Sequence, residues 1–301
     1  MARTIRRDFA SRQIARLQET GALTVPRSYL WRLGRRLYLT ARAETDNRIE
    51  INGESKLQRR LAQASAESGD DLIVFDVGAN VGEWTVSMLE HSQSAGIAVD
   101  IHSFEPVPET FQLLAASIAA SSAGSRVVPV QAALADQTGS TDIHVSSAGA
   151  GTNSLVAEAA SRGRETNAIT IETYTAVDYC NSVGLQRIDL LKIDVEGFDM
   201  SVIEGARELF EAEKVGVCQF EYNHCWVFSR RYLKDVFDFA ESLNGYQVGK
   251  VTAEGIWIFD YWNPELDRFF ESNYVLVHRD FEAKVNAKHG SFDRANTFAF
   301  K

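Results

Sequence analysis

Acidic and amide side chains stand directly after apolar segments of this chain, where a ligand can reach them. The first such place is Phe75-Asp-Val-Gly-Ala-Asn-Val-Gly82, a glycine-rich turn between an apolar run and a helical pattern. A turn of this kind lets a ligand approach backbone N–H groups at a helix N-terminus. Its GxNxG spacing differs from GxGxxG, and Asp76 suits a cationic or amine-bearing ligand better than a pyrophosphate. A structural glycine turn is the alternative.

A second acidic residue follows the next apolar run, in His102-Ser-Phe-Glu-Pro106. In doubly wound folds an acid at the end of the second strand holds a ribose diol, because one carboxylate accepts from both hydroxyls. Taken alone, Glu105 is also compatible with a solvated strand end. After the glycine turn, it favours a ligand that contains a nucleoside.

The string Asp189-Leu-Leu-Lys-Ile-Asp-Val-Glu-Gly197 combines an apolar strand with alternating charges. Lys192, Asp194 and Glu196 are two positions apart, so in a strand they point in one direction. Charges in a buried strand are costly unless they are paired. We expect Asp194 and Glu196 to face the ligand crevice at the carboxyl end of the strand. A salt-bridged network around Lys192 is the alternative.

Strand-like and helix-like segments alternate and must position these groups. The expected strands are Leu72 to Val77, Val99 to Glu105, Arg126 to Leu134, Ile188 to Asp194 and Val215 to Tyr222. The expected helices are Val81 to His91, Pro106 to Ala120, Met200 to Phe210 and Arg231 to Leu243. This order predicts βαβ units and a parallel sheet. A hairpin near Thr141 to Ser146 is expected as an insertion, and Tyr246 to Thr252 is expected to pair antiparallel with Gly255 to Asp260 at the sheet edge.

Together these strings resemble the FkbM-type S-adenosylmethionine-dependent methyltransferases. The resemblance is carried by FDVGANVG, SFEP, AALAD at 132 to 136, DLLKIDVEG with Gly205-Ala206, and QFEYN at 219 to 223. It spans Asp71 to Arg279 and implies an α/β fold with a Rossmann-like seven-stranded methyltransferase sheet. We expect a basic helical appendage over residues 1–70, the methyltransferase domain over 71–280 and a weakly ordered tail over 281–301.

The resemblance also implies a cofactor and a reaction, namely O-methylation by S-adenosylmethionine of a hydroxyl on a small molecule, sugar or natural-product intermediate. The residues expected around the methionine part are Asp76, Gly78, Asn80 and Gly82. Glu105 would bind the ribose, and Ala133, Leu134 and Asp136 would border the adenine.

A hydroxyl acceptor must lose its proton, so a general base is expected. The candidates are Asp194, Glu196, Glu221 and His224. The acceptor side is expected to consist of Glu221 to Trp226, the loop Gly149 to Leu155 and the N-terminal helix. Glu221, His224 and Cys225 lack a CxxC or HExxH frame, so no metal is expected.

Charge is unevenly distributed along the 301 residues, whose net charge is -10. Residues 1–42 hold ten arginines against Asp8 and Glu19, which gives +8 there and leaves -18 for the rest. A nucleic-acid substrate is therefore not expected for the main body. The basic start could pack on its own domain, or contact phosphate, anionic lipid or an acidic partner. With no membrane-spanning run and no secretory signal, the sequence predicts a cytoplasmic protein with reduced cysteines; it does not reveal the oligomeric state.

Two other functions stay open at this point. An NAD-type oxidoreductase would use a related sheet, although Asn80 stands where its fingerprint has a glycine. A non-catalytic module could keep the cofactor fold while its basic N-terminus binds a partner.

Overall fold

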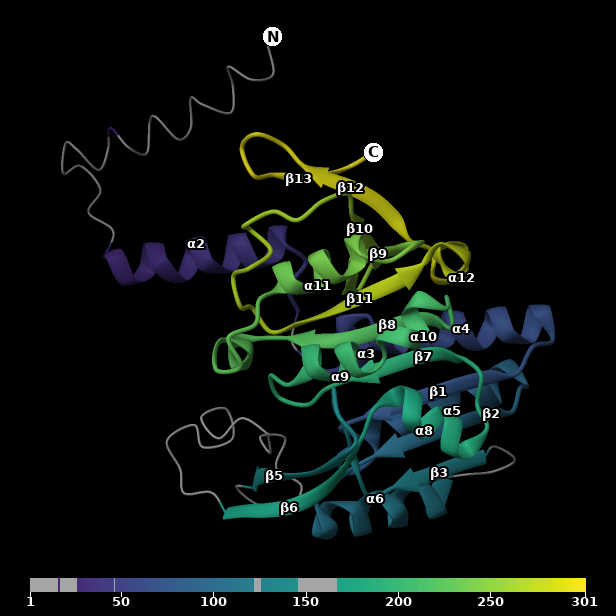
Figure 1. Cartoon of the computed structure of the whole chain (residues 1–301). Helices are drawn as coiled ribbons and strands as arrows, with labels where there is room; N and C mark the ends of the chain where they lie inside the picture. The colour runs from purple at the N-terminus through teal and green to yellow at the C-terminus, as the bar shows by residue number, and fades with distance from the viewer. Residues whose placement is uncertain (1–15, 17–25, 46, 122–125, 146–166) are drawn as a thin grey trace. The chain divides into compact units, whose positions relative to one another are not determined.

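The computed structural model describes residues 16, 26–45, 47–121, 126–145 and 167–301. These residues form a ten-stranded sheet with the order β13-β12-β10-β9-β11-β8-β7-β1-β2-β3 (Figure 1). The strands are β1 (Leu72–Val77), β2 (Val99–Phe104), β3 (Arg126–Val130), β7 (Ile188–Ile193), β8 (Val215–Tyr222), β9 (Tyr246–Thr252), β10 (Gly255–Phe259), β11 (Ser272–His278), β12 (Lys288–Phe292) and β13 (Phe298–Phe300).

The centre of this sheet is parallel. β1 pairs with β2 and β7, β2 pairs with β3, and β7 pairs with β8, all in parallel. β11 runs antiparallel to both of its neighbours, β8 and β9. The run β3-β2-β1-β7-β8-β11-β9 is a seven-stranded Rossmann-like sheet, so the predicted fold class is confirmed. The sequence analysis missed β11, which lies between β8 and β9, and counted Gly255 to Asp260 as the seventh strand instead.

The remaining strands differ in part from the predictions. β9 and β10 form the predicted antiparallel pair, but β12 and β13 continue the sheet beyond them. The third predicted strand ends at Val130, where the chain leaves the large sheet. It enters a three-stranded sheet of β4 (Ala133–Leu134), β6 (Asn167–Tyr174) and β5 (Gly139–Val145), the last of which covers most of the predicted hairpin segment.

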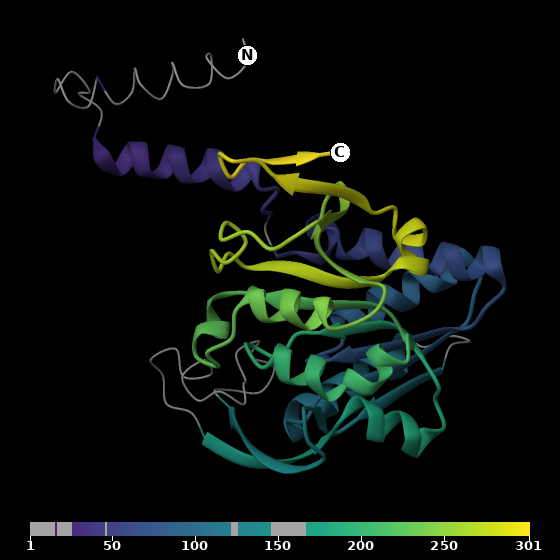
Figure 2. The same ribbon diagram turned by 45° about the horizontal axis from the view of Figure 1, so that its top comes forward.

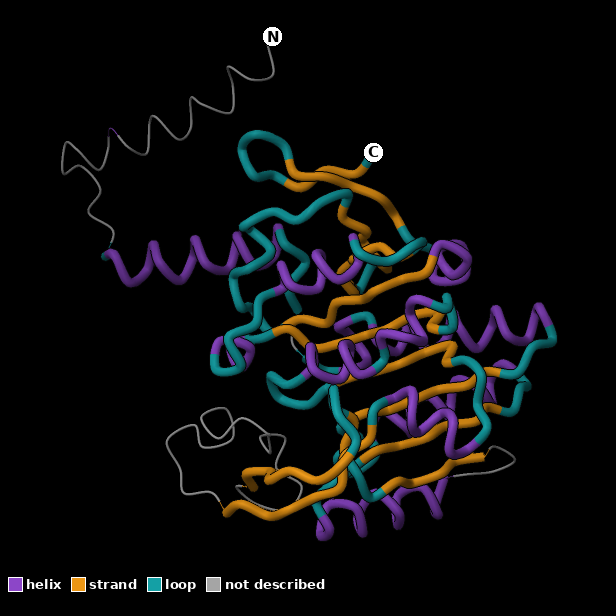
Figure 3. Tube along the Cα trace, viewed as in Figure 1, coloured by secondary structure: helices purple, strands orange, loops and turns teal. Residues whose placement is uncertain are grey.

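Helices cover both faces of the large sheet, as Figures 1 and 2 show. One face carries α4 (Glu54–Ser68), α5 (Glu83–Ala95) and α6 (Pro108–Ser121). The other carries α8 (Ala176–Val183), α9 (Asp199–Gly205), α10 (Arg207–Glu211) and α11 (Leu233–Glu241). Shorter elements are α3 (Ile49–Asn52), η1 (His224–Val227), η2 (Arg279–Phe281) and α12 (Glu282–Val285). Figure 3, in which strands are orange and helices purple, shows the sheet between its helical layers.

Two apolar cores form because strand side chains alternate between the faces. In β7, Leu191 and Ile193 belong to the core under α8, α9 and α11, whereas Leu190 belongs to the core under α4 and α5. Every residue of β7 and β8 is buried. This double burial is why the sequence shows continuous apolar runs there.

Contacts divide the chain at Ala43, earlier than the predicted boundary at residue 70. The reason is α4, whose Leu57 and Leu61 are buried in the core together with β1. The segment predicted as a weakly ordered tail instead joins the large sheet, because β12 pairs with β10 and with β13.

In the first unit, α2 (Arg27–Ala41) buries no residue. Among the described residues, none of the helices combines the length and apolar character needed to cross a bilayer.

Candidate active site

Three neighbouring parallel strands change from apolar to polar side chains toward their carboxyl ends. The register places Asp76 of β1 beside Lys192 of β7, and Lys192 beside Gln219 of β8. Paired positions point to the same face of a sheet, so these three side chains form a row under α4 and α5. Carboxyl ends of parallel strands are where open α/β sheets bind ligands.

Lys192 is the centre of this row. Its Nζ lies 3.1 Å from Asp76 Oδ1 and 3.7 Å from Asp194 Oδ2. Burial alone would lower the pKa of Lys192, but the neighbouring carboxylates, Asp76 first, outweigh burial and raise the pKa. The salt-bridged network set out above as an alternative is therefore present. It includes Asp194, whose side chain is 40% exposed and so remains open to a ligand.

Asp76 itself is closed off from solvent. Its side chain is fully buried, and its Oδ2 accepts from Thr85 Oγ1 at 2.6 Å. The carboxylate thus has Lys192 on one side and a hydroxyl on the other. Its contacts are internal, and any influence on a cofactor would pass through Lys192 or through the turn that follows.

The glycine turn lies against the end of β7. Gly78 has φ +77°, and a Cβ at this position would stand 1.9 Å from the backbone oxygen of Asp194. Glycine is needed here because both the conformation and the space exclude a side chain. The turn continues through Asn80, with φ 49°, to Gly82 at the N-cap of α5. Asn80 Oδ1 is buried and has no hydrogen-bond partner within the described residues.

Glu105 joins this turn to the end of β2. Its Oε2 accepts from Asn80 N at 3.1 Å, and its Oε1 accepts from Val107 N at 2.9 Å. Burial raises the pKa of Glu105 to about 7. Each carboxylate oxygen has a second lone pair, so two hydroxyls can still bind. The unpaired Asn80 oxygen, the close backbone and this carboxylate fit an amine, a main-chain-like group and a diol, which S-adenosylmethionine combines.

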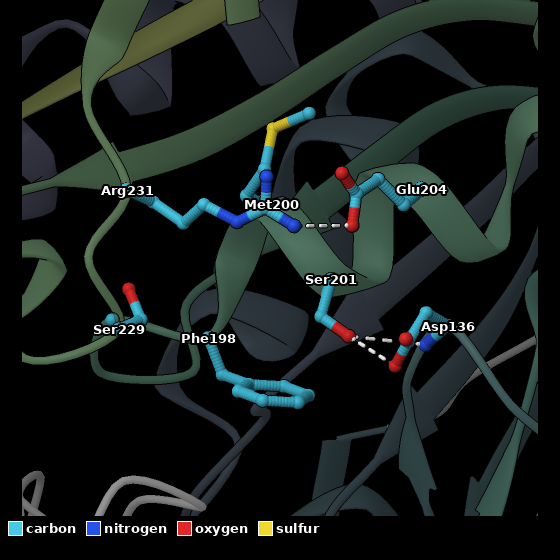
Figure 4. Close-up of a pocket in the computed structure, with 8 residues that line it drawn as sticks. Asp136, Phe198, Met200, Ser201, Glu204, Ser229 and Arg231 are labelled. Carbon is cyan, nitrogen blue, oxygen red and sulfur yellow. Dashed lines mark hydrogen bonds and ion pairs between the residues drawn. The ribbon is translucent and has the colours of Figure 1, made fainter. Parts of the chain in front are cut away.

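Ala133 and Leu134 lie in β4, where both are buried. Asp136 follows them at the surface, and its carboxylate accepts from Ser201 Oγ at 2.6 Å. It forms one wall of a pocket of ≈ 200 Å³ with the start of α9. Figure 4 shows the opposite wall, where Arg231 donates to Glu204 at 2.9 Å. The pocket is lined by Asp136, Gly197, Phe198, Met200, Ser201, Glu204, Ser229 and Arg231.

Glu221, at the end of β8, is the most enclosed of the predicted bases. Its two oxygens accept from Asn47 Nδ2 at 2.9 Å and from Asn223 Nδ2 at 2.5 Å. Burial, followed by the negative charges of Asp194 and Glu196, raises the pKa of Glu221 well above its usual range. The surroundings of Glu221 therefore favour its protonated form over its charged form.

Glu196 and His224, the other predicted bases, differ from Glu221 in their surroundings. The strand ends at Ile193, and Glu196 lies in a turn with φ 52°, so its alternation with Lys192 is lost. Glu196 Oε2 accepts from Cys225 Sγ at 3.5 Å. His224 is exposed.

Trp226, expected on the acceptor side, is buried and donates from Nε1 to the backbone oxygen of Glu221. The loop Gly149 to Leu155 lies outside the described residues.

A buried cluster of hydrogen-bonded polar side chains around Glu54, which the sequence analysis missed, lies beside the row at the start of α4. Glu54 Oε1 accepts from Asn52 Nδ2 at 2.5 Å and from Asn273 Nδ2 at 3.1 Å. Its Oε2 accepts from Gln219 Nε2 at 2.5 Å. Burial raises the pKa of Glu54, while the charge of Lys192 lowers it. The available signals were Asn52-Gly-Glu54 before a helical pattern and single amides within the apolar strands at positions 219 and 273.

Asp199, in the first turn of α9, is a second enclosed acid. It is 1% exposed, and its Oδ2 accepts from Gly197 N at 3.1 Å. Burial, with Asp194 adding to it, raises the pKa of Asp199 to about 8. In the part of the chain that the structure describes, no three His, Cys, Asp or Glu side chains are grouped to hold a metal ion. All three cysteines are buried and form no disulfide.

The sheet order, the glycine turn and the acid at the end of the second strand define the class of Rossmann-like methyltransferases. The family model described as Methyltransferase FkbM domain matches residues 76–248. The chain belongs to this family, as the sequence predicted.

Two curated relatives are also methyltransferases. One is hexuronic acid methyltransferase AglP of Haloferax volcanii, 26% identical over 157 residues, which cover 52% of this chain and 57% of that protein. The other is methyltransferase sdnD of Sordaria araneosa, 28% identical over 160 residues, which cover 45% of this chain and 60% of that protein. The matches thus span less than two thirds of either relative.

Solved structures show more distant likeness. Monomeric WbdD has a TM-score of 0.41 and 12% identity, with 80% of this chain and 43% of that chain covered. The O-methyltransferase from Bacillus cereus in complex with SAH has a TM-score of 0.37 and 9% identity, with 87% and 96% covered.

Proposed function

We propose that this chain is an S-adenosylmethionine-dependent O-methyltransferase that acts on a hydroxyl of a small molecule, sugar or natural-product intermediate. The proposal rests on the hydrogen bond between Asn80 and Glu105, together with the partly exposed carboxylate of Asp194, which contacts Lys192 of the polar row. Family membership supports methyl transfer. It also disfavours the NAD-type oxidoreductase considered above.

The cofactor would be held by backbone and side chains of the glycine turn. Gly78, Asn80 and Gly82 would surround the methionine part, with Asp76 acting beneath them through Lys192. Glu105 would accept from the ribose hydroxyls, and Ala133, Leu134 and Asp136 would border the adenine. When bound, S-adenosylmethionine supplies an electrophilic methyl group on a sulfonium.

We assign removal of the acceptor proton to Asp194. Its carboxylate follows the end of β7 and is 40% exposed, whereas Asp76 is fully buried. Lys192 Nζ, 3.7 Å away, holds this carboxylate in position through an ion pair. A positioned base typically adds about 10²- to 10⁴-fold to the rate. Glu196 and His224 remain candidates at the rim.

Glu221 and its two amide partners would orient the acceptor. The carboxyl group of Glu221 can hydrogen-bond to a hydroxyl of the acceptor, and the amides of Asn47 and Asn223 fix its position. Such a mixture of donors and acceptors suits a polyhydroxylated molecule. The hexuronic acid named for the relative AglP supports a sugar among the substrates to be tested.

The test is turnover of S-adenosylmethionine labelled at its methyl carbon. A panel of free hexuronic acids, neutral sugars and a cell extract is incubated with the protein, and product is followed as S-adenosylhomocysteine and as labelled acceptor. A methyl ether survives mild base, whereas a methyl ester does not, so the methylated oxygen is identified. We expect a base-stable product.

Asp194→Asn serves as the matched inactive variant. If no acceptor in the panel or extract yields S-adenosylhomocysteine although the cofactor binds, the non-catalytic alternative is favoured. If NAD and not S-adenosylmethionine raises the melting temperature, the proposal is wrong.

A further inference from the structure

The helix α2 (Arg27–Ala41) has a charge composition unlike that of the rest of the chain. Between residues 26 and 43 there are five arginines, and no Asp or Glu occurs between residues 20 and 43. The whole protein has a net charge of -10, so this concentration of positive charge is local. A surface of this sign attracts anions.

Three leucines and three arginines of α2 lie on different sides of the helix. Residues three or four positions apart share one side of a helix. Leu30, Leu33 and Leu37 follow this spacing, while Arg32, Arg35 and Arg36 fall outside the arc that the leucines define. The helix is therefore amphipathic, with leucines on one side and arginines on the other, although Trp31 and Leu39 lie on the side of the arginines.

The apolar side is large and reaches solvent. Tyr29, Leu33 and Leu37, each four positions from the next, are 60%, 46% and 63% exposed. Exposed apolar side chains that gather on one helix side commonly mark an interaction surface. Trp and Tyr are the residues enriched where hydrocarbon meets polar headgroups, since each has an apolar ring and a polar tip.

We propose that α2 binds the surface of an anionic lipid bilayer and lies in the plane of the interface. The apolar side would enter the boundary of the acyl chains, and the arginines would contact lipid phosphates. A nucleic acid would satisfy the arginines but not the leucines. The bilayer interface satisfies both sides of the helix, and this pattern is typical of interfacial helices. The proposal is independent of the methyltransferase activity.

The experiment uses the full chain and two kinds of vesicle. One contains equal amounts of dioleoylphosphatidylglycerol and dioleoylphosphatidylcholine, and the other contains dioleoylphosphatidylcholine alone. Cosedimentation should show at least tenfold stronger binding to the anionic vesicles, and 1 M salt should release most of the protein because the charges are screened. Equal binding to both kinds of vesicle would overturn the proposal, as would binding to a DNA duplex but to neither vesicle.

Charge reversal locates the surface. Arg32→Glu, Arg35→Glu and Arg36→Glu, made together, should weaken binding at least tenfold. The matched control reverses three exposed cations of the second unit, Arg59→Glu, Lys214→Glu and Arg294→Glu, and so gives the same net charge. If the control weakens binding as much as the α2 variant does, net charge rather than α2 is responsible and the proposal fails.

A second measurement reports on the leucine side directly, through a tryptophan placed at position 33. Brominated phosphatidylglycerol quenches the fluorescence of tryptophans that enter the acyl region. Quenching should be absent in Trp31→Phe, which still binds the vesicles, and present when Leu33→Trp is added to that variant. Quenching that persists in Trp31→Phe would mean that another part of the chain meets the lipid.

Discussion

Lys192 Nζ lies 3.1 Å from Asp76 Oδ1, and neither side chain has more than 6% exposure. This pair joins β7 to β1 at the point where both strands turn toward the candidate site. Removing one partner of a buried ion pair leaves an uncompensated charge and typically costs about 3 to 5 kcal/mol. The pair therefore couples the stability of the sheet to the chemistry at its edge.

Lys192→Met tests that coupling. We expect a loss of about 3 kcal/mol in the free energy of unfolding, since Asp76 loses its buried cation. Adding Asp76→Asn should recover part of the loss because the buried charge is then gone. Urea denaturation measures both, with Lys214→Met as an exposed control expected to stay within about 0.5 kcal/mol. A Lys192→Met protein as stable as the parent would contradict the argument.

Glu105→Ala should weaken binding of S-adenosylmethionine by about 1 to 3 kcal/mol, because the ribose hydroxyls lose their acceptor. Calorimetry on the folded variant gives the change directly. Glu109→Ala removes an exposed carboxylate of α6 and should leave the affinity unchanged. Unchanged affinity in a folded Glu105→Ala protein would remove the ribose assignment.

Asp199 predicts a pH dependence of stability. Its pKa is raised from 3.8 to about 8 in the folded state, so folding favours the protonated form. The resulting stabilisation is complete below about pH 4 and is lost as the pH rises through about 8. An amide does not titrate, so Asp199→Asn should not show this loss. Between pH 4 and pH 8, the unfolding free energy of the variant should gain about 2 to 4 kcal/mol relative to the parent.

Urea titrations of both proteins at several pH values measure this difference. Glu105, whose pKa is also raised but not by Asp199, is common to the two proteins and cancels in the comparison. A constant difference from pH 4 to pH 8 would show that Asp199 titrates in its ordinary range.

Asp194→Asn should reduce turnover by about 10²- to 10⁴-fold while cofactor affinity stays within about threefold, since the variant keeps the shape and removes the base. Stability should change by less than about 1 kcal/mol, because the ion pair with Lys192 is partly exposed on the Asp194 side. Steady-state kinetics and calorimetry separate these effects, with the exposed Glu208→Gln as control. Turnover that matches the parent in a folded Asp194→Asn protein would exclude Asp194 as the base.

Gly53→Ala tests how the start of α4 holds Glu54 in the site. Gly53 has φ +105°, and a Cβ there would stand 2.3 Å from the backbone oxygen of Thr252. Gly69 also has positive φ, +75°, but nothing lies near its Cβ position. Gly69→Ala should therefore cost about 1 to 2 kcal/mol from conformation alone, and Gly53→Ala should cost more. Equal unfolding free energies for the two variants would show that α4 shifts without penalty.

The sequence by itself determined those features that depend on residues close together in the chain, namely the strands, the helices and the turns between them. Apolar runs such as Ile188–Ile193, alternating with helical segments, predicted the parallel sheet because doubly buried strands must be apolar throughout. The glycine turn and Glu105 were found from their position at strand ends. The hydrogen bond from the backbone N–H of Asn80 to the Glu105 carboxylate shows that the turn and Glu105 lie at one edge of the sheet.

Tertiary structure decided what depends on residues distant in sequence. Glu54 is surrounded by Gln219 and Asn273, which lie 165 and 219 positions away, so no local pattern could bring them together. The same holds for Asn47 and Glu221, whose contact spans 174 positions and sets which predicted carboxylate is enclosed. Asp76 and Asp194 both contact Lys192, yet one is fully buried and the other partly exposed, because exposure depends on the packing of helices over the strand ends.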